Sequence, residues 1–554
     1  MAPRKQVRQA ATVVALGAVV ALSNHVQGQE IGVAARESIL QSARHPWLTW
    51  PDFSDRVSDM RTLYAAEADG LVWFEATELH PSTEAAVEAL VAADSRGLSP
   101  LDYDAPLMLV RLEGLKRGES GEEERALFDL ALSLGLLRHF SDVHRGRVDP
   151  RTVGFGYDGH DTDLDLPVLL RTARDERRIA ETTEGLEPQY PVYKRLKAAL
   201  VRWTQLAKGV LEEAPEVRKL APGDEYPGLG ALVSRLRAFG DLAEDAVIPD
   251  RYEGRVVDAV KSLQDRWGLT PDGALGRETF RALNRSPRSR AEQIELALER
   301  LRWLPDLGGR ELVVVDIPAF LLWAFETTDA PAMTMRVIVG KALRHDTPVF
   351  YGEMKYLTFR PYWNAPYSIA TKELLPKIRT DSGYLERQDL ELVEVANPEA
   401  RSYPPTPENL DLVKRGTLRI RQRPGPRNSL GRVVFSFPNE DNIYMHDTPA
   451  RELFARSRRD FSHGCIRLED PMGLVRWVLR RKPEWTEERI NAALEQTRPT
   501  WVGLDQPIPV VLFYATAFVD SQGRQRFFDD IYGLDERLRQ ALAHGYPYPR
   551  TTSR

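Results

Sequence analysis

Ser462-His463-Gly464-Cys465-Ile466-Arg467 contains the only cysteine among the 554 residues of this chain. A free cysteine is often a small, buried and unreactive hydrophobic residue. Here a histidine lies two positions before the cysteine, and Arg456, Arg458 and Arg459 lie within nine positions upstream of it. Cationic neighbours lower the pKa of a thiol and favour the nucleophilic thiolate. The surroundings therefore predict a reactive thiol with a lowered pKa at Cys465.

A second histidine, His446, ends a short apolar stretch and precedes Ser462 by fifteen intervening residues. This spacing, followed by Ser-His-Gly-Cys, resembles the signature of the L,D-transpeptidases, the YkuD-like family that remodels bacterial peptidoglycan. The resemblance implies that Cys465 is the nucleophile. It also favours His446 as the catalytic base, because the family spacing places that residue against the thiol. His463 stays open as an alternative base or as a residue that orients the loop.

The remaining candidate site residues surround this motif. Gly464 is expected to let the backbone turn tightly, so that N–H groups near Gly464 and Cys465 face a developing oxyanion. Ser462 is expected to hydrogen-bond one of the two histidines. Arg467 is expected either to bind a substrate carboxylate or to brace the loop. The segment Tyr362-Trp363-Asn364 resembles the family's Tyr-Trp-Asn segment and is expected to contact substrate.

The resemblance implies an acyl-transfer reaction on peptidoglycan. The donor would be a tetrapeptide stem that acylates the cysteine through its third residue and releases the terminal D-Ala. Transfer to the side-chain amine of another stem gives a cross-link between third residues. Transfer to water would make the enzyme an L,D-carboxypeptidase, and transfer to a protein amine would tether that protein to the wall. Carbapenems are expected to acylate Cys465.

Two other classes of function remain open at this point. A wall-binding scaffold without catalysis would show a damaged motif, whereas His446, His463, Gly464 and Cys465 are all present. A metal site is possible in residue type, because two histidines and a cysteine match a His₂Cys ligand set, but no second cysteine or carboxylate pair accompanies them. The sequence predicts no metal and no cofactor. A net charge of −6 gives no basic footprint for nucleic acid.

The N-terminus has the layout of a secretory signal, which predicts export to the periplasm. Arg4, Lys5 and Arg8 precede a thirteen-residue apolar run over residues 10–22. Small residues follow at Val26-Gln27-Gly28, as at a cleavage site. The run is shorter than the roughly 20 residues that span a bilayer. We expect a signal peptide over residues 1–28, with an uncleaved anchor as the alternative.

The rest of the chain divides by pattern into a multidomain α+β protein. Residues 38–206 show helical periodicity and resemble the scaffold domain of large periplasmic L,D-transpeptidases. Within them, His139 and His144 are expected to be structural or surface histidines. Residues 226–286 resemble a three-helix peptidoglycan-binding-like module, with a Pro-Asp-Gly turn after its second helix. Whether the module binds glycan or is a spacer stays open. The Arg-rich stretch 285–290 is expected to link it onward.

From about residue 293 the pattern becomes mainly β, with strands separated by Gly, Pro and Asn turns. Residues 295–533 are expected to form the catalytic domain and residues 534–554 a C-terminal tail. Between Ile369 and Arg419 the β pattern lapses, and residues 370–419 are expected to be an inserted capping or lid subdomain. As the alternative, this insertion is a surface excursion without function.

Overall fold

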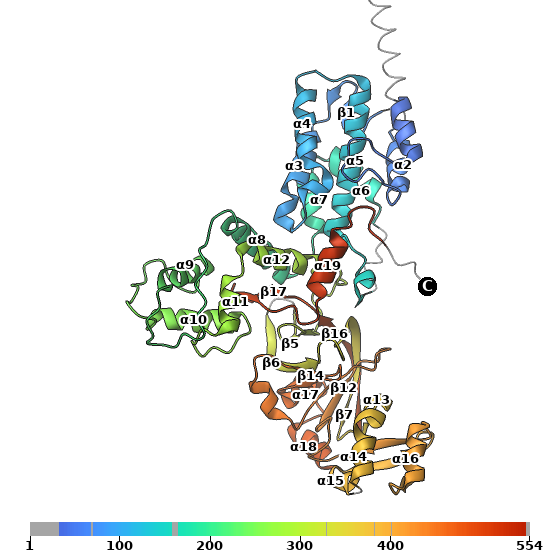
Figure 1. The fold of residues 1–554 in the computed structure, drawn as a ribbon. Coiled ribbons are helices and arrows are strands. Elements are labelled where there is room, and N and C mark those ends of the chain that lie inside the picture. The colour runs from blue at the N-terminus through green and yellow to red at the C-terminus, as the bar shows by residue number, and fades with distance from the viewer. Residues whose placement is uncertain are drawn as a thin grey trace, which may run out of the picture.

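The computed structural model describes residues 33–67, 70–157, 164–327, 330–381, 383–399 and 401–549. The expected signal peptide at residues 1–28 lies outside these described residues. Within the described ranges, no helix combines the length and the apolar character needed to cross a bilayer. Figure 1 shows an elongated molecule with helices at one end, a β-sheet region below them and a small mixed unit at the far end.

The N-terminal region is helical, as predicted. Its long central helix is α5 (Glu122–Arg145), whose first turn carries three glutamates that favour the positive end of the helix dipole. Around it pack α2 (Val57–Ala65), α3 (Thr83–Val91), α4 (Ala105–Lys116), α6 (Leu166–Asp175) and α7 (Ile179–Leu186). Helix α8 (Pro191–Leu206) packs instead against α12 (Pro287–Leu301). His139 on α5 is fully buried, and burial lowers its pKa to about 3. It is a neutral core histidine, as the sequence analysis expected.

The second unit contains three helices, α9 (Leu229–Phe239), α10 (Arg255–Arg266) and α11 (Arg277–Asn284). The turn between α10 and α11 is fixed by Gln264, which accepts a hydrogen bond from the Gly273 N–H (2.9 Å). Gly273 has a φ of +75°, which favours glycine at this position. The predicted helices and turn are therefore confirmed.

The Arg-rich stretch 285–290 is not the linker that we expected. It contains the first turn of α12 (Pro287–Leu301), where the Ser286 side chain caps the helix by accepting from the Ser289 N–H. Arg290 is buried and its guanidinium lies over the rings of Trp267 (4.3 Å) and Phe527 (4.8 Å). Cation–π contacts of this kind fasten the helical module onto the C-terminal hairpin.

Helix α12 also joins the N-terminal helices to the catalytic region through buried ion pairs. Glu299 is fully buried and accepts hydrogen bonds from the backbone of Arg147 (2.5 Å) and Val148 (3.2 Å). Its second oxygen pairs with Arg302 (3.2 Å). The adjacent Arg300 pairs with Asp535 (2.5 Å) near the C-terminus. Because a buried charge without a partner is costly, these contacts fix the position of α12.

The region after α12 contains a large mixed sheet, so the predicted α+β class with a mainly β C-terminal part is confirmed. The strands follow the order β12-β13-β15-β6-β5-β4-β16-β7-β3, and an additional β12–β7 pairing closes the sheet on itself. The bounds are β3 (Phe155–Gly156), β4 (Leu312–Asp316), β5 (Leu321–Phe325), β6 (Pro331–Gly340), β7 (Val349–Phe359), β12 (Val433–Ser436), β13 (Met445–His446), β15 (Ile466–Leu468) and β16 (Thr500–Phe513). Strand β14 (Asp460–Ser462) pairs with β6 off this path. Helices α17 (Pro471–Leu479) and α18 (Glu487–Glu495) follow the cysteine loop.

The inserted unit has a sheet and a hydrophobic core of its own. Its sheet order is β10-β9-β11-β8, formed by β8 (Trp363–Asn364), β9 (Leu390–Glu394), β10 (Ser402–Tyr403) and β11 (Leu418–Gln422). The core includes Leu375, Leu392 and Ile420, with α14 (Leu375–Thr380), α15 (Tyr384–Arg387) and α16 (Pro407–Lys414) packed around the sheet. The expectation that the β pattern lapses here was wrong, because β9 is a buried five-residue strand. We call residues 363–422 the cap.

The C-terminal residues form the hairpin β17 (Ala517–Val519) and β18 (Gln525–Phe527), then α19 (Leu534–Leu542). Figure 1 shows α19 lying between the N-terminal helices and the sheet. The side chain of Tyr546 bonds to the buried Asp142 of α5. Residues 534–549 are thus packed against the N-terminal helices.

The buried ion pairs of α12 give a stability prediction. Glu299→Ala leaves the buried Arg302 without its carboxylate partner and two backbone N–H groups without their acceptor, and we expect it to lower the free energy of unfolding by roughly 3–5 kcal/mol. Glu292→Ala on the same helix removes a half-exposed pair with Arg288 and should cost no more than about 1 kcal/mol. Calorimetric unfolding of both variants measures the difference. Equal losses would contradict a joining role for Glu299.

Candidate functional site

The signature residues are brought together by adjacent parallel strands. Strand β13 pairs with β15 so that His446 lies opposite Arg467, and Cys465 immediately precedes β15. The Ile466 N–H donates to the Tyr444 carbonyl (3.1 Å), which extends this pairing toward the cysteine. Strand β14 pairs with β6 on the other side of the loop, with Ser462 opposite Gly340. Strand pairing therefore places His446 beside Arg467 and fixes both ends of the loop that carries His463 and Cys465.

The loop between β14 and β15 is held by Ser462. Its hydroxyl donates to the Cys465 carbonyl (2.6 Å) and accepts from the Gly464 N–H (3.2 Å). The structure thus differs from the expectation that Ser462 bonds a histidine. Gly464 has a φ of +114°, and an added Cβ would lie 3.1 Å from Ile443. Both the turn and the close approach require glycine at this position.

The thiol of Cys465 is half-buried, and burial raises its pKa. Hydrogen bonding by Tyr444 and the charge of Arg467 oppose this effect without overcoming it. The expected lowering of the thiol pKa was therefore wrong. The physical reason is that the upstream arginines act elsewhere: Arg458 pairs with Asp460 (2.7 Å), and Arg459 donates to backbone carbonyls such as that of Val337 (3.2 Å).

His446 is buried at the end of β13 and its ring is unprotonated. Burial, and next the charge of Arg467, lower its pKa to about 3, so the ring is neutral at physiological pH. Its Nδ1 bonds to the Asp447 carbonyl, which orients the ring and leaves Nε2 as an acceptor. The Asp447 carboxylate accepts from the N–H groups of Thr448 (2.8 Å) and Arg432 (2.9 Å). Asp447 is thus a structural group.

His463 faces the cap. Its Nε2 lies 2.9 Å from Glu373 Oε1, and its ring centroid lies 4.7 Å from that of His345. Glu373 lies in a short π-helical turn, Ala370–Leu374, and such turns are frequent at functional sites. The motif loop and the cap are therefore connected by a direct side-chain contact.

The other predicted residues lie around this centre. Arg467 is half-buried, and burial lowers its pKa while the nearby thiol acts in the opposite direction. Trp363 and Asn364 form β8 of the cap sheet, opposite Gln422 and Arg421. The Arg421 guanidinium lies 4.0 Å from the Tyr362 ring centroid. Trp363 and Asn364 are thus part of the cap, and Tyr362 directly precedes it.

The metal alternative finds no support in the side-chain arrangement. Among the described residues, no group of three or more His, Cys, Asp or Glu side chains is placed to hold a metal ion. His463 is directed to Glu373, and His446 bonds to a backbone carbonyl through Nδ1.

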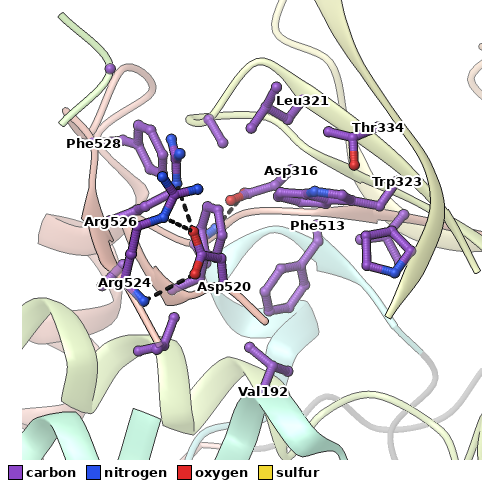
Figure 2. A pocket seen from close by; sticks show the side chains of 18 of the residues that line it. Val192, Asp316, Leu321, Trp323, Thr334, Phe513, Asp520, Arg524, Arg526 and Phe528 are labelled. Atoms are coloured by element: carbon purple, nitrogen blue, oxygen red, sulfur yellow. Dashed lines mark hydrogen bonds and ion pairs between the residues drawn. The ribbon is translucent and has the colours of Figure 1, made fainter. Parts of the chain in front are cut away.

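A cavity of about 670 Å³ lies away from this loop, where the N-terminal helices, the second unit and the sheet meet. Figure 2 shows Trp323 and Phe513 from the sheet facing Val192 of α8, with Asp520 held by Arg524 (2.9 Å) and Arg526 (3.4 Å) at one side. Of the described residues that line it, none belongs to the loop 462–467. The cavity is a feature of the domain junction and separate from the thiol.

Four residues near the motif were missed by sequence reasoning. Tyr444 hydrogen-bonds the thiol, and the Asn442 carbonyl lies 3.9 Å from the sulfur. His345 and Glu373 both contact His463. Tyr444 is two residues before His446 and directly precedes β13, so the alternation of an extended chain was an available signal for it. His345 and Glu373 are distant in sequence and gave none.

Comparison with known protein families identifies three regions. Residues 310–502 match the L,D-transpeptidase catalytic domain, residues 226–283 a putative peptidoglycan binding domain, and residues 58–200 a scaffold domain. The predicted family resemblance is thereby confirmed for each of these regions.

Two individual proteins are also similar. A putative L,D-transpeptidase of Haemophilus influenzae is 33% identical over 254 residues, which are 45% of this chain and 49% of the relative. The chain thus matches about half the length of this curated relative. An L,D-transpeptidase of Xylanimonas cellulosilytica is 16% identical, covering 54% of this chain and 100% of that chain, with a TM-score of 0.17. That superposition is too poor to compare the folds.

The electrostatics of the thiol give a pH prediction. Because burial keeps the pKa of Cys465 above its usual range, alkylation by iodoacetamide should accelerate roughly tenfold per pH unit from pH 6 to 8, with no plateau below about pH 8.5. Tyr444→Phe removes a group that lowers the thiol pKa and should shift the curve to higher pH. Cys465→Ala is the unlabelled control. A plateau below pH 7 would instead indicate a preformed thiolate–imidazolium pair.

Proposed function

We propose that this chain, which combines an L,D-transpeptidase catalytic domain with a peptidoglycan-binding domain and a scaffold domain, cross-links peptidoglycan stems through an acyl-enzyme on Cys465. The observation that supports this most strongly is the arrangement of a neutral, buried His446 on the strand paired with the one that follows the cysteine. A neutral imidazole is the form that accepts the thiol proton.

The reaction has two balanced steps. In the first, His446 takes the proton of Cys465, and the sulfur forms a bond with the carbonyl carbon of the third stem residue. The bond to the terminal D-Ala breaks, and its amine takes the proton from the imidazole. In the second, the side-chain amine of another stem attacks the thioester carbonyl, the C–S bond breaks, and the proton released by the amine returns to the sulfur.

The raised thiol pKa fits this order of events. A neutral thiol and a neutral imidazole form no ion pair before substrate binds, so charge separates only when the substrate carbonyl is in place. The Gly464 N–H is already bonded to Ser462, which makes the Cys465 N–H our candidate donor to the oxyanion. Arg467, beside His446, is the candidate partner for a substrate carboxylate.

The cap is proposed to cover the donor stem. It contains Trp363 and Asn364 in β8, directly after Tyr362, and contacts the motif loop through Glu373 and His463. An ion pair between exposed groups is weak, so this contact can open for substrate and close again.

The location of the proposed substrate, peptidoglycan, implies the cellular compartment in which the protein acts. Peptidoglycan enzymes of this family act outside the cytoplasm, and the basic and apolar pattern of residues 1–28 supports export to the periplasm by a signal peptide. Water as acceptor would give L,D-carboxypeptidase activity from the same acyl-enzyme, and product analysis distinguishes that outcome from cross-linking.

Acylation tests the nucleophile and base. After incubation with a carbapenem, intact-mass measurement should show one covalent adduct on the purified wild-type protein. The Cys465→Ala variant should carry none. His446→Gln keeps a hydrogen-bonding side chain without a base, and we expect it to slow acylation roughly 100-fold or more. His463→Gln should slow acylation much less. Loss of the adduct only in His463→Gln would assign the base to His463. Absence of an adduct on the wild-type protein would refute the proposal that this chain is an enzyme with a reactive Cys465.

The cap contact gives a separate kinetic prediction. Glu373→Ala should raise KM for a tetrapeptide donor roughly twofold to fivefold and leave kcat within about twofold, because an exposed pair contributes little. Glu373→Gln, which keeps an acceptor oxygen, should show an intermediate KM. The matched control is Glu386→Ala, an exposed glutamate on α15 of the same cap. A change in kcat alone would argue against a positioning role.

A further inference from the structure

An open cleft of about 650 Å³ lies between the peptidoglycan-binding domain and the catalytic sheet. Thr270 lines it from the loop after α10. The catalytic side contributes Lys341, which follows β6, and the residues Arg456, Arg458, Asp460 and Phe461, which lead into the cysteine loop. The cleft therefore connects the domain that is expected to bind the wall with the segment that positions the nucleophile.

The cleft carries an excess of positive charge. Arg458 is neutralised by Asp460 (2.7 Å), whose carboxylate also accepts from the Ala342 N–H (3.4 Å). Within the described parts of the chain, Lys341 and Arg456 have no carboxylate at ion-pair distance, and the Arg456 guanidinium lies 5.4 Å from the Phe461 ring centroid. Two exposed cations beside an aromatic ring favour an anionic ligand with some apolar surface.

The distance from this cleft to the thiol suits a short peptide. The Lys341 N–H donates to the Ser462 carbonyl (3.0 Å), so these residues are neighbours across the β6–β14 pairing. Ser462 precedes Cys465 by three residues, a separation of at most about 10 Å in extended chain. Lys341 therefore lies within roughly 15 Å of the nucleophile. A stem of three residues spans about 10 Å when extended, which is of the same order as this upper bound.

We propose that this cleft holds the acceptor stem during cross-linking. It would take an anionic peptide that carries a primary amine, with the peptide carboxylates beside Lys341 and Arg456 and the amine directed to the thioester on Cys465. This inference rests on the proposed function. The glycan strand that carries the acceptor continues toward Thr270, so the peptidoglycan-binding domain and the thiol engage one strand.

The test separates acceptor use from acylation. Purified full-length protein is given a tetrapeptide donor and increasing acceptor stem, and the ratio of cross-linked to hydrolysed product is measured. The double variant Lys341→Ala/Arg456→Ala should need roughly fivefold to tenfold more acceptor for the same ratio, since each exposed charge contributes modestly. Its carbapenem acylation rate should stay within about twofold of wild type, which also shows that the site is folded.

Three further measurements make the outcome decisive. Added salt should raise the acceptor requirement of the wild type and much less that of the double variant, because salt screens exposed charges. Thr270→Trp should raise the requirement by filling the cleft from the opposite side. Lys355→Ala removes an exposed lysine of β7 outside the cleft and should change nothing. An unchanged product ratio in both cleft variants overturns the proposal, whereas failure of the wild type to form the acyl-enzyme refutes the proposed function itself.

Discussion

The fold depends on one buried charge, the carboxylate of Glu299 on α12. Its two oxygens accept from the backbone after α5 and pair with Arg302, so a single side chain fixes the N-terminal helices against α12. The adjacent Arg300 and Asp535 extend the same arrangement to the C-terminal helix α19. In a buried setting each charge requires its partner, and that requirement makes the relative position of these elements specific. Strand β3, contributed by the N-terminal region, pairs with β7 and completes the connection.

Strand pairing in the catalytic sheet determines the positions of the residues at the candidate site. The parallel pairing of β13 with β15 sets His446 beside Arg467, and the pairing of β14 with β6 fixes the other end of the cysteine loop. Side chains that are far apart in sequence thus share one surface through backbone hydrogen bonds. The thiol remains protonated because this setting is buried, whatever the number of arginines nearby in sequence.

Sequence reasoning succeeded where a pattern is local. Periodicity predicted the helices α9, α10 and α11 and the main strands of the catalytic sheet. The motif predicted that His446 and Cys465 belong to one site. It failed where tertiary contacts decide. Arg290 looked like part of a charged linker, yet it is buried between two aromatic rings. Strand β9 has a mixed charged and apolar sequence that gave no clear signal until its partners β10 and β11 were known. Glu373 could not be linked to His463 without the fold.

The way the cap joins the catalytic domain has an evolutionary consequence. The chain enters the cap at Trp363 and leaves it at Gln422, and these two residues are direct antiparallel partners. Entry and exit are therefore about 5 Å apart, which is the geometry of a domain insertion. Because the cap also has its own core, another small domain with adjacent termini can replace it without altering the strands that hold Cys465. The size and sequence of the inserted unit are in this way independent of the strands on either side of the cysteine loop.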